Sequence, residues 1–100
     1  MNIIKDSGQE KLQFGLMGKF TYKDHNAFND VLHSIATDPA KSVQLDMHDL
    51  VFVDSAALGM LLLAHDEAKK NGKRISVTGL GGQVQKMFDM TRMTGMFKPQ

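Results

Sequence analysis

The sequence predicts an α/β domain in which a small mixed β-sheet carries helices mainly on one face. Short apolar or alternating segments, typical of strands, take turns along the chain with segments whose apolar residues recur at helical spacing. Turn-forming residues separate the two kinds of segment. The 100 residues, 42% of them hydrophobic, suffice for one compact core but not for two. We therefore expect a single domain over residues 1–100.

The sheet is predicted to open with a hairpin. Residues 2–5 form a short strand candidate, residues 6–8 (Asp-Ser-Gly) form a turn, and residues 11–20 alternate well enough to be the partner strand.

An amphipathic helix is predicted over residues 24–36. Its apolar residues at helical spacing are Phe28, Val31, Leu32 and Ile35. Asp24 is a suitable N-cap, and the pair Asp38-Pro39 ends the segment. This helix should lie on the sheet.

The second half of the chain alternates strands and helices. The predicted elements are a strand at 42–46, an apolar strand-like run at 51–53, a helix at 55–71 with Gly72 as C-cap, a strand at 74–78, a turn at 79–82, and a helix from 83 to about 94 before Gly95. A strand, a helix and a strand in succession imply a parallel crossover.

The junction between the run at 51–53 and the following helix is the most informative feature of the sequence. Asp54 and Ser55 interrupt the apolar pattern, and both residue types favour helix N-caps. We expect Ser55 to be the cap or its neighbour, with its hydroxyl near the surface. The positive end of the helix dipole would tolerate a phosphoryl group there, so Ser55 is either only a capping residue or also a phosphoacceptor.

Residues 54–59 (Asp-Ser-Ala-Ala-Leu-Gly), preceded by apolar residues 50–53, resemble the signature of STAS domains, the family of bacterial anti-sigma factor antagonists. Further landmarks fall in the same order as in that family: Gly18-Lys19-Phe20, Val43-Gln44-Leu45-Asp46, residues 72–77 and residues 84–90. The resemblance spans nearly the whole chain.

The resemblance implies a phosphorylation-controlled binding protein with Ser55 as phosphoacceptor. Since Ser55 lies in no G-x-S-x-G motif and has no evident histidine–carboxylate partner, we expect no enzymatic activity, and the absence of cysteine fits the cytoplasm. The binding partner would be an anti-sigma factor and serine kinase of the histidine-kinase-like ATPase type, and a PP2C-type phosphatase would reverse the modification. Asp54 would shape the loop or contact the kinase. The residues expected at the partner interface are Asp54, Ser55, Ala56, Ala57, Leu58, Gly59, Met60 and Leu63. Free protein would be a monomer or weak dimer.

One departure from the family pattern leaves an alternative open. Ala56 and Ala57 stand where relatives commonly have Ser or Thr followed by Gly. Alanine favours a well-formed first turn and restricts close approach of a partner's backbone. STAS domains also occur as constitutive subunits of lipid-transporting ABC complexes and as parts of larger signalling or transporter proteins. In such a role Ser55 would be a structural contact that is never modified.

Composition and charge exclude several functions. A net charge of +1 gives no general attraction to nucleic acid or anionic lipid, and no apolar run is long enough to insert into a membrane. The absence of cysteine excludes disulfides and thiolate metal sites. The histidines lack metal-binding spacing, and we expect solvated or singly hydrogen-bonded roles for His25, His33, His48 and His65. We expect no cofactor and no metal.

Four further patterns have simple structural interpretations. The first two turns of the helix at 55–71 are apolar nearly all round, which indicates either full burial or a docking surface beside Ser55. Met87, Met90, Met93 and Met96 recur every three residues and are interpreted as core-filling, with an adaptable partner surface as the alternative. A solvated helix end is expected for the basic cluster of Lys69, Lys70, Lys73 and Arg74. Residues 79–82, though rich in glycine, lack the full fingerprint of a phosphate-binding loop.

Overall fold

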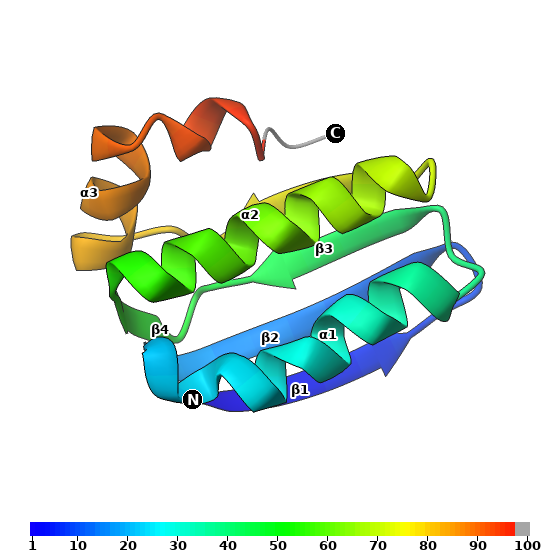
Figure 1. The fold of residues 1–100 in the computed structure, drawn as a ribbon, viewed down its shortest axis with the longest axis horizontal. Coiled ribbons are helices and arrows are strands. Elements are labelled where there is room, and N and C mark those ends of the chain that lie inside the picture. Colours follow the sequence, from blue (N-terminus) through cyan, green and yellow to red (C-terminus); the bar gives the residue numbers. More distant parts are fainter. Residues whose placement is uncertain (98–100) are drawn as a thin grey trace.

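The computed structural model describes residues 1–97 and has a five-stranded mixed sheet with two long helices across one face (Figure 1). The elements are β1 (Asn2–Ser7), β2 (Lys11–Phe20), the 3₁₀ helix η1 (Tyr22–Asp24), α1 (His25–Thr37), β3 (Ser42–Asp46), β4 (Leu50–Val53), α2 (Ser55–Lys70), β5 (Arg74–Thr78), α3 (Gly82–Met90) and the 3₁₀ helix η2 (Met93–Gly95). The predicted fold class is confirmed.

The sheet is built around β2 and β3. β1 pairs with β2 in antiparallel fashion, while β3 runs parallel to β2 and β5 runs parallel to β3. β4 pairs in parallel with the last residues of β2, beyond the part that β3 occupies. The predicted hairpin and parallel arrangement are therefore present, although β4 and β5, which α2 connects, are not neighbours in the sheet.

Alternation along the strands places one face of the sheet in the core. β2 contributes Leu12, Phe14 and Leu16, β3 contributes Val43 and Leu45, and β5 contributes Ile75 and Val77. The two helices pack against each other and cover this face with Phe28, Val31 and Ile35 of α1 and Ala57, Leu61, Ala64 and Ala68 of α2. Each helix thus buries one stripe of apolar residues, as its spacing requires.

The entry into α1 differs from the predicted cap. Asp24 stands at the N-cap position of α1, but its carboxylate makes no capping bond to that helix. Instead it accepts from the Thr21 N–H at 2.9 Å and completes a capping box on η1. Thr21, three residues before Asp24, therefore starts the helical segment earlier than the sequence predicted.

The last helix is shorter than predicted and its methionines do not share one environment. α3 ends at Met90 because Arg92 adopts a left-handed conformation (φ 60°), after which η2 changes direction. The prediction of one core-filling stripe is therefore wrong. Met93 is buried and Met87 half-buried, but Met90 is 73% exposed and Met96 is 39% exposed.

Two predictions for polar side chains are wrong: Lys73, expected at a solvated helix end, is partly buried, and His65, expected to be solvated or singly hydrogen-bonded, is buried with no hydrogen-bond partner for its Nδ1 within residues 1–97. Lys73 crosses from the end of α2 to α1, where its ammonium donates to the carbonyls of Ile35 (2.5 Å) and Asp38. His65 packs edge-on against Phe97, with ring centroids 5.4 Å apart. Lys73 is thus a cap for the carboxyl end of α1, and His65 belongs to the core.

Candidate partner-binding site

Asp54 organises the corner between β4 and α2. Its backbone is extended, and one carboxylate oxygen accepts from the Ala57 N–H at 2.8 Å, which makes Asp54 the N-cap of α2. The other oxygen accepts from the Tyr22 N–H at 3.0 Å. One side chain therefore caps α2 and also ties it to η1. Ser55 is the neighbour of the cap, one of the two positions predicted for it.

Ser55 is the first residue of α2 and is exposed. Among residues 1–97, neither its hydroxyl nor the backbone N–H groups of Ser55 and Ala56 have a hydrogen-bond partner. Unpaired N–H groups at a helix start carry partial positive charge. The corner can therefore accept an anion on the Ser55 hydroxyl without breaking an existing bond.

Gln83 of α3 holds the strand that leads into this corner. Its side-chain amide accepts from the Val53 N–H at 2.9 Å and donates to the Val53 carbonyl at 2.8 Å. This pair of bonds imitates one step of a β-ladder on β4. The peptide just before Asp54 is thereby fixed between β2 on one side and α3 on the other.

A continuous stripe of α2 remains accessible beyond Ser55. Ala56, Gly59 and Leu63 follow at helical spacing and are exposed, Leu63 to 51%. Together with Tyr22, which Asp54 holds beside the start of the helix, Ser55 and these three residues form what we call the docking face. Of the two alternatives for this helix, full burial and a surface left open beside Ser55, the structure has the second.

Three residues expected at the partner interface do not belong to the docking face. Ala57, Leu58 and Met60 are buried, with exposed fractions of 6% or less. They lie on the side of α2 that packs on the sheet, because residues three or four positions apart share a helix face. Of the predicted interface, only Ser55, Ala56, Gly59 and Leu63 are exposed, with Asp54 partly so.

Sequence reasoning missed Tyr22, Val51 and Phe52, which are exposed apolar side chains near the corner. The apolar run at 51–53 has no alternation that would mark an outward position. An irregularity in the pairing between β2 and β4 at Gly18 and Lys19 lets two successive residues of β4 face outward. Tyr22 lies 32 residues before Asp54, and only the fold brings the two together.

Within residues 1–97, His, Asp and Glu side chains nowhere gather in the threes that a metal site would need. No helix in that range combines the length and apolar character needed to cross a bilayer.

A family model described as "Mlab, STAS domain" matches residues 5–98. The chain belongs to the STAS domain family. A STAS-domain containing protein of Pseudomonas aeruginosa (strain UCBPP-PA14) is 33% identical over 91 residues, which are 91% of this chain and 88% of the relative.

Solved structures of anti-sigma factor antagonists share the fold at low sequence identity. An anti-sigma factor antagonist from Mycobacterium paratuberculosis superposes with a TM-score of 0.83 at 14% identity, covering 96% of this chain and 81% of that one. The anti-sigma factor antagonist SpoIIAA in its unphosphorylated form gives 0.72 at 15% identity, covering 89% and 83%. The phosphorylated form of the Bacillus cell fate determinant SpoIIAA gives 0.72 at 16% identity, covering 95% and 87%.

Proposed function

We propose that this STAS domain is a phosphorylation-controlled anti-sigma factor antagonist that acts in the cytoplasm without catalysing a reaction itself. Unphosphorylated, it binds an anti-sigma factor with serine kinase activity through the docking face and so releases the regulated partner of that protein. Phosphorylation of Ser55 blocks this binding, and a phosphatase restores it.

The exposed Ser55 hydroxyl at the start of α2, adjacent to an apolar surface, is the observation that carries the proposal. A kinase can reach this hydroxyl, because Asp54 and not Ser55 provides the cap. Ala56, Gly59 and Leu63 offer the partner small and apolar contacts without an opposing charge. The proposal also agrees with SpoIIAA, an anti-sigma factor antagonist solved in unphosphorylated and phosphorylated forms.

A phosphate on Ser55 would act on the interface more than on the fold. It adds about −1.5 to −2 charge at pH 7, which must lose its water when an apolar surface covers it. At the amino end of α2 the same charge is favoured by the dipole and by the unpaired N–H groups of Ser55 and Ala56. Binding should therefore weaken while the stability of the domain is kept.

In this proposal Asp54 holds the start of α2 and the neighbouring 3₁₀ helix in place for the kinase. Its two hydrogen bonds to Ala57 and Tyr22 fix both the helix start and the neighbouring 3₁₀ turn. A kinase that recognises the docking face thereby meets Ser55 in a defined position. Contact between Asp54 and the kinase would be an additional role, and loss of phosphorylation in Asp54→Asn with normal partner binding would support it.

The first experiment tests whether a single phosphate is added to Ser55. The purified protein is incubated with ATP and a lysate of its source organism and analysed by intact-mass spectrometry with fragment mapping. We expect a single phosphate on Ser55, and none in Ser55→Ala. Modification of other serines with Ser55 untouched would contradict the proposal.

The second experiment tests whether a negative charge at position 55 prevents partner binding. The partner captured by wild-type protein should be retained by Ser55→Ala and lost by Ser55→Asp. Gln9→Glu is the control, since it adds the same charge at an exposed position in the turn between β1 and β2, at the end of β2 opposite to the one that pairs with β4. Partner binding by Ser55→Asp at wild-type strength would overturn the proposal.

A constitutive subunit of a lipid-transporting ABC complex is the second candidate, favoured by Ala56 and Ala57 in place of the common Ser/Thr-Gly pair. In that role the docking face binds a transporter ATPase and Ser55 stays unmodified. Co-purification with such an ATPase, with no phosphate on Ser55, would select this function over the switch.

A further inference from the structure

The face of the sheet opposite α1 and α2 carries a groove, which is separate from the docking face. Parallel strands are usually covered on both faces, yet no helix in residues 1–97 covers this second face of β2, β3 and β5 (Figure 1). The groove has a volume of about 390 Å³. Its lining residues are Glu10, Lys11, Ser42, Val43, Gln44, Arg74, Ser76 and Thr78.

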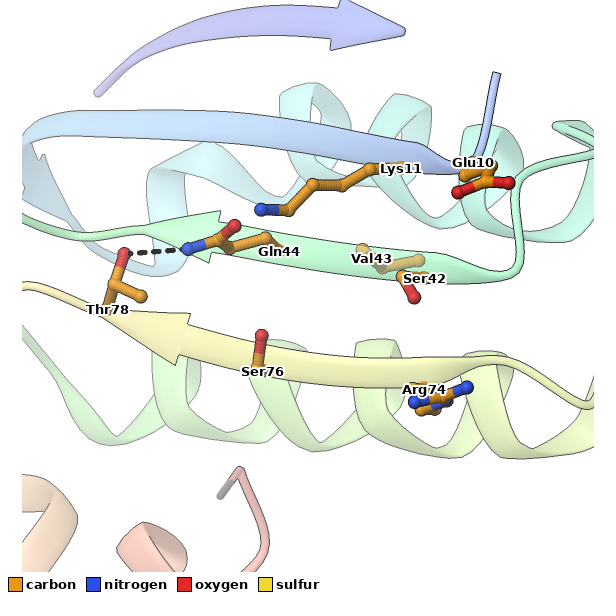
Figure 2. A pocket seen from close by; sticks show the side chains of 8 residues that line it. All are labelled: Glu10, Lys11, Ser42, Val43, Gln44, Arg74, Ser76 and Thr78. Carbon is orange, nitrogen blue, oxygen red and sulfur yellow. Dashed lines mark hydrogen bonds between the residues drawn. The ribbon is translucent and has the colours of Figure 1, made fainter. Parts of the chain in front are cut away.

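Strand register arranges the lining in rows. Lys11, Ser42 and Arg74 are aligned across β2, β3 and β5. The Lys11 side chain extends from this row toward Gln44 (Figure 2). Lys11 and Arg74 belong to strands two positions apart, about 10 Å between their backbones. The next outward row on β3 and β5 is Gln44 and Ser76, and Thr78 follows.

The groove is hollow because its floor consists of short side chains, and it is polar because these side chains carry hydroxyl groups. Ser42, Ser76 and Thr78 leave space above the strands where longer side chains would fill it. Figure 2 shows Lys11 extended along the gap between β2 and β3, the hydroxyls of Ser76 and Thr78 on the neighbouring strand, and Glu10 at one end. The concavity thus has cationic sides and hydroxyl groups in its floor.

Most of these polar groups have no partner within the described chain. The amide of Gln44 donates to the Thr78 hydroxyl at 3.4 Å. In residues 1–97 the Lys11 ammonium and the Arg74 guanidinium form no ion pair, and the hydroxyls of Ser42 and Ser76 form no hydrogen bond. The groove therefore holds two cations and one carboxylate, that of Glu10, which forms no ion pair in this part of the chain, and its net positive charge would favour a ligand with negative charge.

We propose that this groove binds a small phosphorylated polyol, such as a sugar phosphate. The phosphate lies over Ser42, where the Arg74 guanidinium can donate two parallel hydrogen bonds to its oxygens, and the Lys11 side chain, which extends toward Gln44 in Figure 2, turns to contact it. The hydroxyl groups of the ligand pair with Ser76, Gln44 and the carboxylate of Glu10. Glu10 disfavours a bare anion and favours a ligand that also donates hydrogen bonds. This site is independent of Ser55 and of its phosphorylation.

The test is a titration followed by the backbone amide signals in NMR at constant ionic strength. Ribose 5-phosphate is the probe, with ribose and inorganic phosphate as separate arms. We expect saturable shifts at Ser42, Gln44 and Ser76 with ribose 5-phosphate, none with ribose, and about tenfold weaker binding of phosphate alone. Equal affinity for phosphate and ribose 5-phosphate would contradict the polyol part of the proposal.

Variants locate the site. Lys11→Gln with Arg74→Gln should lower the affinity about tenfold or more, whereas Lys69→Gln with Lys70→Gln, which removes the same charge from the exposed end of α2, should change it less than about twofold. Ser76→Ala, which alters no charge, should weaken binding in a fully folded protein. Shifts that do not saturate by about 10 mM, or equal losses in both double variants, would overturn the proposal.

Discussion

Gly79 lies so close to His48 that no other residue fits in its place. A Cβ atom on Gly79 would be 2.6 Å from the backbone nitrogen of His48, and Gly79 has φ +75°. The loop after β5 thereby packs against the loop between β3 and β4, and the Met47 N–H donates to the Thr78 carbonyl at 2.8 Å beside this contact. This contact holds together the two loops that follow β3 and β5.

Gly79→Ala is therefore expected to destabilise the domain by about 2 to 4 kcal/mol, because a left-handed backbone and a steric clash with backbone atoms add together. Urea unfolding followed by circular dichroism measures this. Gly95→Ala is the matched control, since a Cβ there meets nothing within 4 Å and its φ is not in the left-handed range. A change below about 1 kcal/mol in Gly79→Ala would show that the loops move apart without cost.

Lys73→Met should destabilise the fold by about 1.5 to 3 kcal/mol, as expected for lost hydrogen bonds from a charged donor. The lysine ammonium donates to the Ile35 and Asp38 carbonyls at the end of α1, whereas methionine keeps the unbranched apolar stem but has no donor. Lys70→Met, at an exposed position of α2, should change the unfolding free energy by less than about 0.5 kcal/mol. Equal effects of the two substitutions would refute the capping role.

Asp38 makes the stability depend on acid pH. The Ala40 N–H and then the Ser7 hydroxyl donate to this carboxylate, at 2.8 and 2.7 Å, and lower its pKa from the ordinary value of 3.8. A lowered pKa in the folded state means that the unfolded chain takes up the proton first as pH falls. The contribution of Asp38 is thus complete well above pH 3.8 and is lost as pH falls through the folded-state pKa.

The free-energy difference between wild type and Asp38→Asn, measured by urea unfolding, should therefore be constant at neutral pH and shrink on acidification below 3.8. A difference that stays constant down to the acid end of the titration would mean that the asparagine substitution acts only through lost geometry.

The strands and the central helices were predictable because their patterns are local. β2, β3 and β5 have the predicted bounds, and α2 begins at the predicted Ser55. α3 was predicted too long because the left-handed residue that ends it is Arg92, which carries no helix-stopping signal in the sequence. Asp6 and Ser7, predicted as a turn, extend β1 because they pair with β2.

Asp54 and Ser55 of the candidate site were predictable from the sequence, whereas the residues that surround them were not. Asp54 and Ser55 combine a cap pattern with an abrupt change of periodicity, which one sequence segment can reveal. The placement of Tyr22 beside Asp54 and of Gln83 on Val53 depends on contacts between residues about 30 positions apart. The groove on the opposite face arises from register across three strands, which no single segment contains.

Substitution of Gly59 should change the stability of the domain and the binding of the proposed partner in opposite directions. It lies within α2, is exposed, and a Cβ there would meet nothing within 4 Å. Glycine in a helix interior costs about 0.5 to 1 kcal/mol relative to alanine, so Gly59→Ala should raise the unfolding free energy by that amount. The same methyl group would stand on the docking face one turn beyond Ser55 and keep a closely packed partner away.

Partner binding by Gly59→Ala, measured by surface plasmon resonance with the captured partner, should therefore weaken by about tenfold while the unfolding free energy rises. Gly95→Ala, which adds the same methyl group at an exposed position of η2, outside the docking face, serves as the control and should bind like wild type. A rise in the unfolding free energy together with a loss of partner affinity would show that Gly59 serves the interface and not the stability of the fold. If Gly59→Ala were more stable and bound the partner normally, the partner would have to contact the corner around Tyr22 and Ser55 without covering the helix.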